Sequence, residues 1–527
     1  MESDRDPAPD RPYNRREFLH RGARVTAGLG LGSAMVDRGS GQPASRSENA
    51  ITTDDGFSDS DRPNILLIMT DQHHFEALSC MGHPVVQTPH LDRLASRGTL
   101  FQNAYCASAA CAPSRASIFS GMFPSAHGVA RNNLPINGRL DPDLTPELLS
   151  RAGYHSHLVG KLHFNPAAEY HGFDSRDLHD GCSAMYDPQQ PAESDYVRWL
   201  ADRRFGGDRQ EVVRRFDENE GQIDTDLFRF AMGSDWRSAE EHSNTWVTDR
   251  AVDFLQNRPS DRPFFLFTSY FGPHHPYLVP EPWASRHDPD AVPLPDHFAV
   301  DFSDRPIARR TPLYRLFEQQ SDFTDRQCRE LLAQYYGQIE MIDDGVGRIL
   351  DQLDRSGLAD NTVVVFTADH GDYAGQFGWF FKATCYSGAV RVPLIVADPR
   401  GEGPRGVACE RVVNNMDLFP TLNRWAGADR PTQTTMSRDL RPLLADPAGP
   451  GWEDETFSEF AGMNMVVSRG LKLMRYRTDD GVFHELYDTA ADPQDFVNLW
   501  DRPEVSKRQA KLMRRLDELK EAVKLTS

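Results

Sequence analysis

The sequence predicts an α/β protein with a large, mostly parallel central sheet flanked by helices, followed by a smaller C-terminal α+β domain with a short antiparallel sheet. Short apolar runs of strand length alternate with segments of helical periodicity, which is typical of a parallel sheet covered by helices. Four of these runs are followed directly by polar residues. In α/β proteins the active site lies at the carboxyl ends of the strands, so these polar residues are candidates for the site. Past residue 427 the pattern changes to short antiparallel strands and one amphipathic helix.

The predicted strands of the first domain are continuous apolar runs rather than alternating ones. Such runs indicate strands that are buried on both faces of a sheet. The first run, ILLIMT, starts the folded part of the chain directly after residue 63. In chain order the predicted strands cover residues 65–70, 101–104, 155–159, 263–271, 362–367 and 392–396.

The predicted helices occupy the segments between these strands. A helix that starts around residues 114–119 would place Cys111 just before a helix N-terminus, where free N–H groups stabilise developing negative charge. Residues 181–243 are irregular, charged and aromatic, and we interpret them as an elaboration over the pocket. The other predicted helices cover residues 89–97, 144–153, 196–205, 240–255, 334–353 and, in the C-terminal domain, 505–523.

The composition is that of a large globular protein and excludes several functional classes. The chain has 527 residues, enough for two or more domains, and a formal net charge of -20. This charge argues against binding to nucleic acid or to an anionic membrane surface. Seven cysteines without CxxC spacing predict neither a zinc ribbon nor a disulfide framework, and leave room for one or two bridges.

The N-terminal segment predicts export from the cytoplasm. Arg15-Arg16-Glu17-Phe18-Leu19 and the short apolar run after it resemble a twin-arginine export signal, with a basic unstructured tail as the alternative. We assign residues 1–44 to the signal and the Ser- and Asp-rich residues 45–62 to a linker. The apolar run is too short to span a bilayer, so we expect a periplasmic or extracellular protein without a stable membrane anchor.

Polar residues at the strand ends predict a metal site. Asp71 and Gln72 follow the first strand, and Asp369 and His370 follow the strand at 362–367. Carboxylate and amide oxygens suit Ca²⁺ or Mg²⁺, and an imidazole shifts the preference toward Mn²⁺ or another transition ion. Taken singly, Asp-Gln could cap a helix and Asp-His-Gly could form a turn. Together with the Cys111 segment, at matching places in the α/β pattern, they indicate ligands of one divalent cation.

The segment Cys111-Ala112-Pro113-Ser114-Arg115 resembles the signature of the formylglycine-dependent sulfatases, which have an alkaline-phosphatase-like sandwich fold. Without that resemblance, a lone cysteine is more often a buried structural thiol. The resemblance covers residues 63–393. It implies that a formylglycine-generating enzyme oxidises Cys111 to an aldehyde, whose hydrate attacks sulfur and expels the alcohol. Deprotonation of the second hydroxyl then releases inorganic sulfate.

The same resemblance assigns roles to further residues. Cys111, once modified, would also contact the cation, for which we expect Ca²⁺, with Mn²⁺ or Mg²⁺ as alternatives. Arg115 would orient the hydrate, and Lys161 and His163 would contact it. His274 and Lys382 would bind the sulfate oxygens and the leaving oxygen, where fixed positive charge stabilises the transition state. His274 is the candidate general acid, His275 its neighbour, and Asn132 or Asn133 a pocket residue.

The metal motif departs from the commonest sulfatase pattern. Gln72 stands where many members carry a second Asp, and His370 stands where many carry Asn. The pair of Gln and His at these two positions resembles the choline-sulfatase-like and phosphonate-monoesterase-like branches. A quaternary ammonium substrate would need an aromatic cage, for which Tyr186, Trp199 and Trp236 are available. We therefore expect a sulfatase acting on a carbohydrate sulfate or choline sulfate. The alternative is a phosphonate or phosphate mono- or diester hydrolase with the same centre.

Overall fold

The computed structural model describes residues 62–136, 143–181, 194–221, 232–295, 301–311, 324–429 and 434–526, with residues 140, 298, 314 and 431 between them. Residues 63–527 belong to one compact unit. The predicted export signal and nearly all of the predicted linker lie outside the described residues. In the described part of the chain, no helix is both long and apolar enough to cross a membrane.

The centre of the fold is an eight-stranded sheet with the order β10-β2-β9-β8-β1-β6-β3-β4. All neighbouring strands are parallel except at β9, which runs antiparallel to both β2 and β8. The predicted mostly parallel sheet is therefore confirmed. Its strands are β1 Asn64–Thr70, β2 Thr99–Tyr105, β3 His155–Gly160, β4 Ser175–Leu178, β6 Phe264–Ser269, β8 Thr362–Ala368, β9 Leu394–Ala397 and β10 Val407–Asn414.

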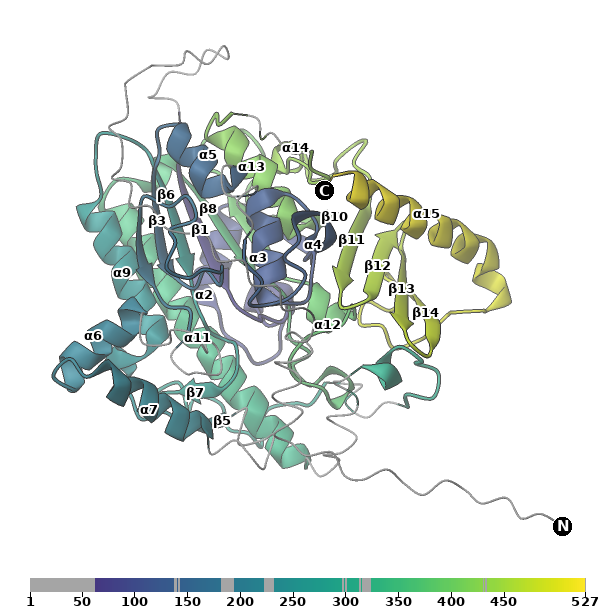
Figure 1. The fold of residues 1–527 in the computed structure, drawn as a ribbon, viewed down its shortest axis with the longest axis horizontal. Coiled ribbons are helices and arrows are strands. Elements are labelled where there is room, and N and C mark those ends of the chain that lie inside the picture. Colours follow the sequence, from purple (N-terminus) through teal and green to yellow (C-terminus); the bar gives the residue numbers. More distant parts are fainter. Residues whose placement is uncertain are drawn as a thin grey trace, which may run out of the picture. The chain divides into compact units, whose positions relative to one another are not determined.

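The continuous apolar sequence of β1 is explained by cores on both faces of the sheet. Because successive side chains of a strand point to opposite faces, Ile65 and Leu67 enter one hydrophobic core and Leu66 and Ile68 enter the other. The first core includes residues of α3, α5 and α13, and the second includes residues of α2, α9 and α11. The sheet is thus the middle layer of a three-layer sandwich (Figure 1).

The helices follow the predicted segments with shifted ends. The longest, α11, begins at Asp325, nine residues before the predicted start at Gln334, because Thr324 and Gln327 form a capping box there. On α9 the imidazole of His242 accepts a hydrogen bond from the Asn244 N–H and so delays the start to Ser243. The helices are α2 Pro89–Ser96, α3 Cys111–Ser120, α4 Pro124–His127, α5 Thr145–Arg151, α6 Asp195–Arg204, α7 Arg209–Gly221, α9 Ser243–Asn257, α11 Asp325–Arg355, α12 Ser387–Val390, α13 Leu418–Trp425, α14 Arg441–Ala445 and α15 Ser506–Leu525.

The C-terminal part contains the predicted antiparallel sheet and amphipathic helix. The strands β11 Glu455–Phe460, β12 Met463–Ser468, β13 Leu471–Thr478 and β14 Gly481–Asp488 pair in sequence order. Leu512, Leu516 and Leu519 of α15 share a hydrophobic core with residues of this sheet, and α15 lies along the sheet in Figure 1. Strand β11 also joins the segment before α3, because the Glu459 N–H donates to the Ala107 carbonyl at 3.0 Å.

Candidate active site

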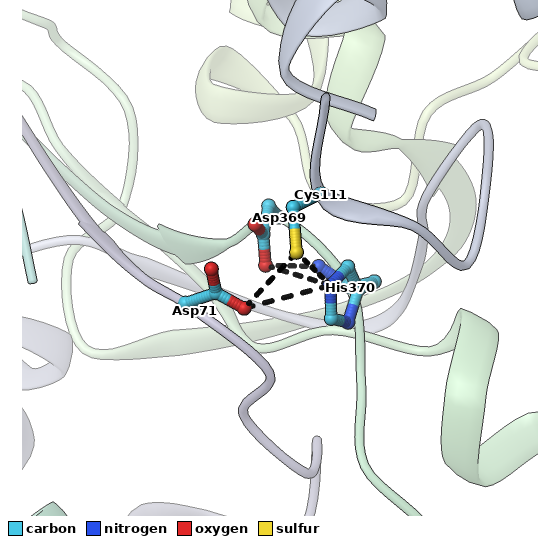
Figure 2. A group of neighbouring side chains, drawn as sticks. All are labelled: Asp71, Cys111, Asp369 and His370. Atoms are coloured by element: carbon cyan, nitrogen blue, oxygen red, sulfur yellow. Dashed lines mark hydrogen bonds and ion pairs between the residues drawn. The ribbon is translucent and has the colours of Figure 1, made fainter. Parts of the chain in front are cut away.

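The predicted metal ligands meet because two of them follow each of two neighbouring parallel strands. β1 and β8 pair in a register that sets Thr70 opposite Ala368, so the residues that follow leave the sheet at the same level. Asp71 follows Thr70, and Asp369 and His370 follow Ala368. Figure 2 shows Asp71, Asp369 and His370 converging with Cys111, the first residue of α3.

The four converging side chains are completely or almost completely buried and form a compact donor set. Cys111 Sγ lies 3.3 Å from His370 Nε2 and 3.6 Å from Asp71 Oδ1. His370 Nε2 is also 3.5 Å from Asp71 Oδ1 and 3.5 Å from Asp369 Oδ1. One ligand atom from each of the four residues lies within 4.8 Å of all the others. This spacing and chemistry fit one divalent cation.

Hydrogen bonds outside the donor set orient its members. His370 Nδ1 lies 3.0 Å from the Gly371 carbonyl, so the imidazole donates there and turns Nε2 toward the cluster. Burial favours the neutral imidazole, but Asp369 raises the pKa of His370 above its usual value. The main-chain N–H groups of His370 and Gln72 donate to Asp369 Oδ1 at 2.8 and 3.1 Å. The remaining predicted ligand, Gln72, has a buried Oε1 with no hydrogen-bond partner among the described residues.

Cys111 is the predicted nucleophile, and its Sγ marks the position where the hydroxyl oxygens of the predicted formylglycine hydrate would lie. Lys382 Nζ lies 3.0 Å from Sγ. Burial raises the pKa of the thiol, but Lys382, Lys161, His370 and a hydrogen bond with His163 bring it well below its usual value. The site therefore stabilises an anion at this position.

The start of α3 differs slightly from the prediction. Ala110 is the N-cap, so Cys111 is the first helical residue and does not precede the helix. The side chain of Asn132 accepts a hydrogen bond from the Ala112 N–H at 3.1 Å and satisfies one of the free donors of this helix end. Of the two neighbouring asparagines, Asn132 is thus the one that contacts the Cys111 segment.

Arg115 is fully buried and supports the carboxylates. Its Nε donates to Asp369 Oδ2 at 2.8 Å, and its Nη2 lies 3.6 Å from Asp71 Oδ2. Its Nη1 donates to the Lys161 carbonyl at 2.7 Å and to Ser269 Oγ at 2.9 Å. These contacts hold the carboxylates beside Cys111 and do not act on Sγ itself, so the predicted role of Arg115 in orienting the hydrate stays a prediction.

Lys161 and His163 approach from the segment after β3. Lys161 Nζ lies 2.5 Å from Asp71 Oδ2 and 4.3 Å from the centre of the Phe271 ring. The segment is held by Asp180, whose Oδ1 accepts hydrogen bonds from the N–H groups of Leu162 and His163 at 2.7 and 2.8 Å. Asp180 was not identified from the sequence, because no local pattern connects it with Lys161.

His274 and His275 lie beside the donor set on the segment after β6. Their rings stack with centres 4.1 Å apart, and His274 Nδ1 donates to the His275 carbonyl at 2.5 Å. Burial and Lys382 lower the pKa of His274 to about 4. The free site therefore holds His274 neutral, and a general acid role requires an anionic substrate to raise this pKa. His275 has a contact of its own, because its Nδ1 lies 3.2 Å from Gln72 Nε2.

The aromatic residues considered for an ammonium cage have other partners. The Trp199 ring stacks on Tyr196 of α6, and Trp236 packs against Phe205 and against Phe216 of α7. Tyr186 lies outside the described residues. These contacts assign Trp199 and Trp236 to the packing around α6 and α7.

Comparisons with known proteins agree with this geometry. Residues 63–428 match the family model described as Sulfatase, and residues 375–522 match the model described as N-sulphoglucosamine sulphohydrolase, C-terminal. The N-acetylglucosamine-6-O-sulfatase of Bacteroides thetaiotaomicron is 26% identical over 88% of this chain and 87% of that relative. The choline-sulfatase of Rhizobium meliloti is 29% identical over 86% of this chain and 85% of that relative. The solved structure of the phosphonate monoester hydrolase of Agrobacterium radiobacter superposes on this chain with a TM-score of 0.74, and the two sequences are 25% identical. The match covers 88% of this chain and 96% of that one.

Proposed function

The chain belongs to the sulfatase family, and from this premise we propose that it hydrolyses a sulfate ester to an alcohol and inorganic sulfate with a formylglycine made from Cys111. The observation that carries the proposal is the position of Cys111 Sγ, at the first turn of α3 and 3.0 Å from Lys382 Nζ, 3.3 Å from His370 Nε2 and 3.6 Å from Asp71 Oδ1. A nucleophile held there faces the Lys382 ammonium and two ligands of the proposed cation, His370 and Asp71.

The proposed cation is held by Asp71, Gln72, Asp369 and His370 together with the modified residue 111. We propose Ca²⁺ as the resident ion, with Mn²⁺ or Mg²⁺ as alternatives, because oxygen donors, which suit Ca²⁺ or Mg²⁺, predominate in this set and His370 is its one nitrogen donor. When bound, the cation supplies Lewis-acid stabilisation of negative charge on the reacting oxygens. The buried Oε1 of Gln72 supports this ligand set, because an unpartnered buried acceptor otherwise costs free energy.

The surrounding side chains would bind the sulfate group and manage its charge. Lys382 and His274 would contact sulfate oxygens and the leaving oxygen, on which negative charge grows as the S–O bond breaks. Lys161 and His163 would contact the nucleophile, and Lys161 neutralises Asp71 at 2.5 Å. Formylglycine supplies the oxygen nucleophile. Its formation requires a formylglycine-generating enzyme during maturation.

We propose a sulfated glycan as the substrate class. The match of residues 375–522 to the C-terminal model of N-sulphoglucosamine sulphohydrolase and the N-acetylglucosamine-6-O-sulfatase relative support a sulfated amino sugar. The test is an assay of purified protein, with residue 111 verified as an aldehyde, on sulfated amino sugars, choline sulfate and phenylphosphonate. Turnover of at least one sulfate ester is expected. Failure on every sulfate ester, with turnover of the phosphonate, would overturn the proposal.

A phosphonate or phosphate ester hydrolase is the second candidate. It is favoured by the likeness to the phosphonate monoester hydrolase and by the two direct carboxylate ligands, Asp71 and Asp369. With fewer negative ligands the cation keeps more positive charge, and it can therefore stabilise tetrahedral anions of either sulfur or phosphorus. We expect sulfate monoesters to be preferred, with a measurable side activity on phosphonates.

Replacing His274 with alanine is expected to slow esters of poor, alkyl-like leaving groups about 10²- to 10⁴-fold, and activated aryl esters much less. The reason is that only the alkyl leaving group needs a proton as it departs. The measurement is kcat/KM on a matched alkyl and aryl sulfate pair. Equal losses on both substrates would exclude His274 as the general acid and leave it a residue that binds sulfate.

A further inference from the structure

A third buried carboxylate, Asp372, lies directly behind Gln72. Its Oδ2 accepts a hydrogen bond of 2.5 Å from Gln72 Nε2, and the side chain is fully buried. The sequence reads Asp369-His370-Gly371-Asp372, but only the first two residues of this run were predicted to be ligands. Asp369 and Asp372 both accept hydrogen bonds from Gln72, the first from its main-chain N–H and the second from its side-chain amide.

The two hydrogens of the Gln72 amide both have acceptors. Asp372 Oδ2 accepts one, and His275 Nδ1, 3.2 Å from Nε2, is placed to accept the other. The amide oxygen is the atom left without a partner among the described residues. Turning the amide over would set Oε1 against the Asp372 carboxylate and remove both hydrogen bonds, so the orientation of Gln72 is determined. We call Asp372 and His275 the Gln72 clamp.

Asp372 is itself held in place from several directions. Its Oδ1 accepts a hydrogen bond from the Ala374 N–H at 2.6 Å. Its Oδ2 accepts from the Phe381 N–H at 3.2 Å and from the Tyr277 hydroxyl at 3.3 Å. The carboxylate is therefore a fixed acceptor.

We propose that Asp372 is a positioning residue for the metal site. It holds the Gln72 amide so that Oε1 faces the cation. Many sulfatases carry a carboxylate ligand, an Asp, at the position of Gln72, whereas here the carboxylate of Asp372 lies behind the Gln72 amide. This inference rests on the cation site of the proposed function. Groups that orient metal ligands through hydrogen bonds typically change metal affinity or activity 10- to 100-fold when they are removed.

Asp372→Asn is expected to weaken Ca²⁺ binding about 10- to 100-fold. Asparagine presents an N–H as readily as an oxygen to Gln72 Nε2, so the amide is no longer held in one orientation. The measurement is calorimetric titration of Ca²⁺ into the metal-free full-length protein. The matched control is Asp343→Asn, which removes a buried carboxylate that accepts hydrogen bonds from the His90 and Leu91 N–H groups. The control should lower thermal stability and leave the Ca²⁺ affinity within about threefold.

A double-mutant cycle separates this role from a merely structural one. In Gln72→Glu combined with Asp372→Asn, the carboxylate and amide exchange places, and the double variant should bind Ca²⁺ at least about tenfold more tightly than the two single effects predict. Additive effects would overturn the proposal, as would an Asp372→Asn variant with unchanged affinity. If both Asp372→Asn and the double variant fail to fold while Asp343→Asn folds, Asp372 is a loop residue and the proposal is wrong. Absence of Ca²⁺ binding by folded wild-type protein would instead reject the Ca²⁺ site of the proposed function.

Discussion

Replacing Asp369 with alanine is expected to abolish hydrolysis of both sulfate and phosphonate esters, with a loss of at least about 10³-fold in kcat/KM. Asp369 is a proposed metal ligand, and it also accepts hydrogen bonds from Arg115 Nε, the Gln72 N–H and the His370 N–H. A catalytic cation contributes several kcal/mol, and each 1.36 kcal/mol corresponds to about tenfold in rate. Removal of the carboxylate would also leave the buried Arg115 with a weaker ion pair to Asp71, 3.6 Å away.

The test combines kinetics on a sulfate and a phosphonate ester with Ca²⁺ affinity. Asp343→Asn again serves as the control for loss of a buried acidic group, because Asp343 caps the start of α2 and contacts none of the site residues named here. A folded Asp369→Ala variant that retained a tenth or more of the wild-type kcat/KM would contradict the ligand assignment. Loss of one activity with retention of the other would show that the two substrate types do not share the centre.

Replacing Lys382 with methionine is expected to lower kcat about 10²- to 10³-fold. Lys382 Nζ lies 3.0 Å from Cys111 Sγ and 3.8 Å from Asp71 Oδ1, and these two anionic groups outweigh burial and raise the pKa of Lys382. The residue therefore stays cationic where negative charge develops. Methionine keeps an unbranched apolar side chain of similar length and removes only the charge and the donors.

Two further variants sharpen the Lys382 test. Lys382→Arg keeps the charge with a different shape and should recover part of the lost rate. Lys507→Met removes an exposed lysine at the start of α15 and should leave kcat unchanged. A Lys382→Met enzyme with raised KM and wild-type kcat would assign the residue to substrate binding, without a separate contribution to the transition state.

The parts of the fold that could be predicted from the sequence are those with strong local patterns. The strands β1, β6 and β8 are buried on both faces and therefore appear as uninterrupted apolar runs. The polar residues after them were identified as candidate ligands because parallel strands deliver their following residues to one edge of the sheet. The pairing of β1 with β8 then brings Asp71 and Asp369 together.

Other features depend on tertiary contacts and left little local signal. β10 was missed because charged residues interrupt it at Glu410 and Arg411, on a strand at the edge of the sheet where side chains reach solvent. Asp180 acts through two main-chain N–H groups, which no sequence motif records. One indication in the sequence that Asp372 belongs to the site is its position three residues after Asp369. Its partner Gln72 lies 300 positions earlier, and only the folded chain sets the two side by side.

Peptide mass spectrometry of the active enzyme tests whether Cys111 is the precursor of the catalytic residue. The protein should be produced together with a formylglycine-generating enzyme, purified to constant specific activity and digested. We expect the peptide containing Cys111-Ala112-Pro113-Ser114-Arg115 to carry an aldehyde at position 111, in a fraction that rises in proportion to specific activity across preparations. Fully active enzyme in which this peptide contains only the intact thiol would show that Cys111 is not converted to formylglycine for catalysis.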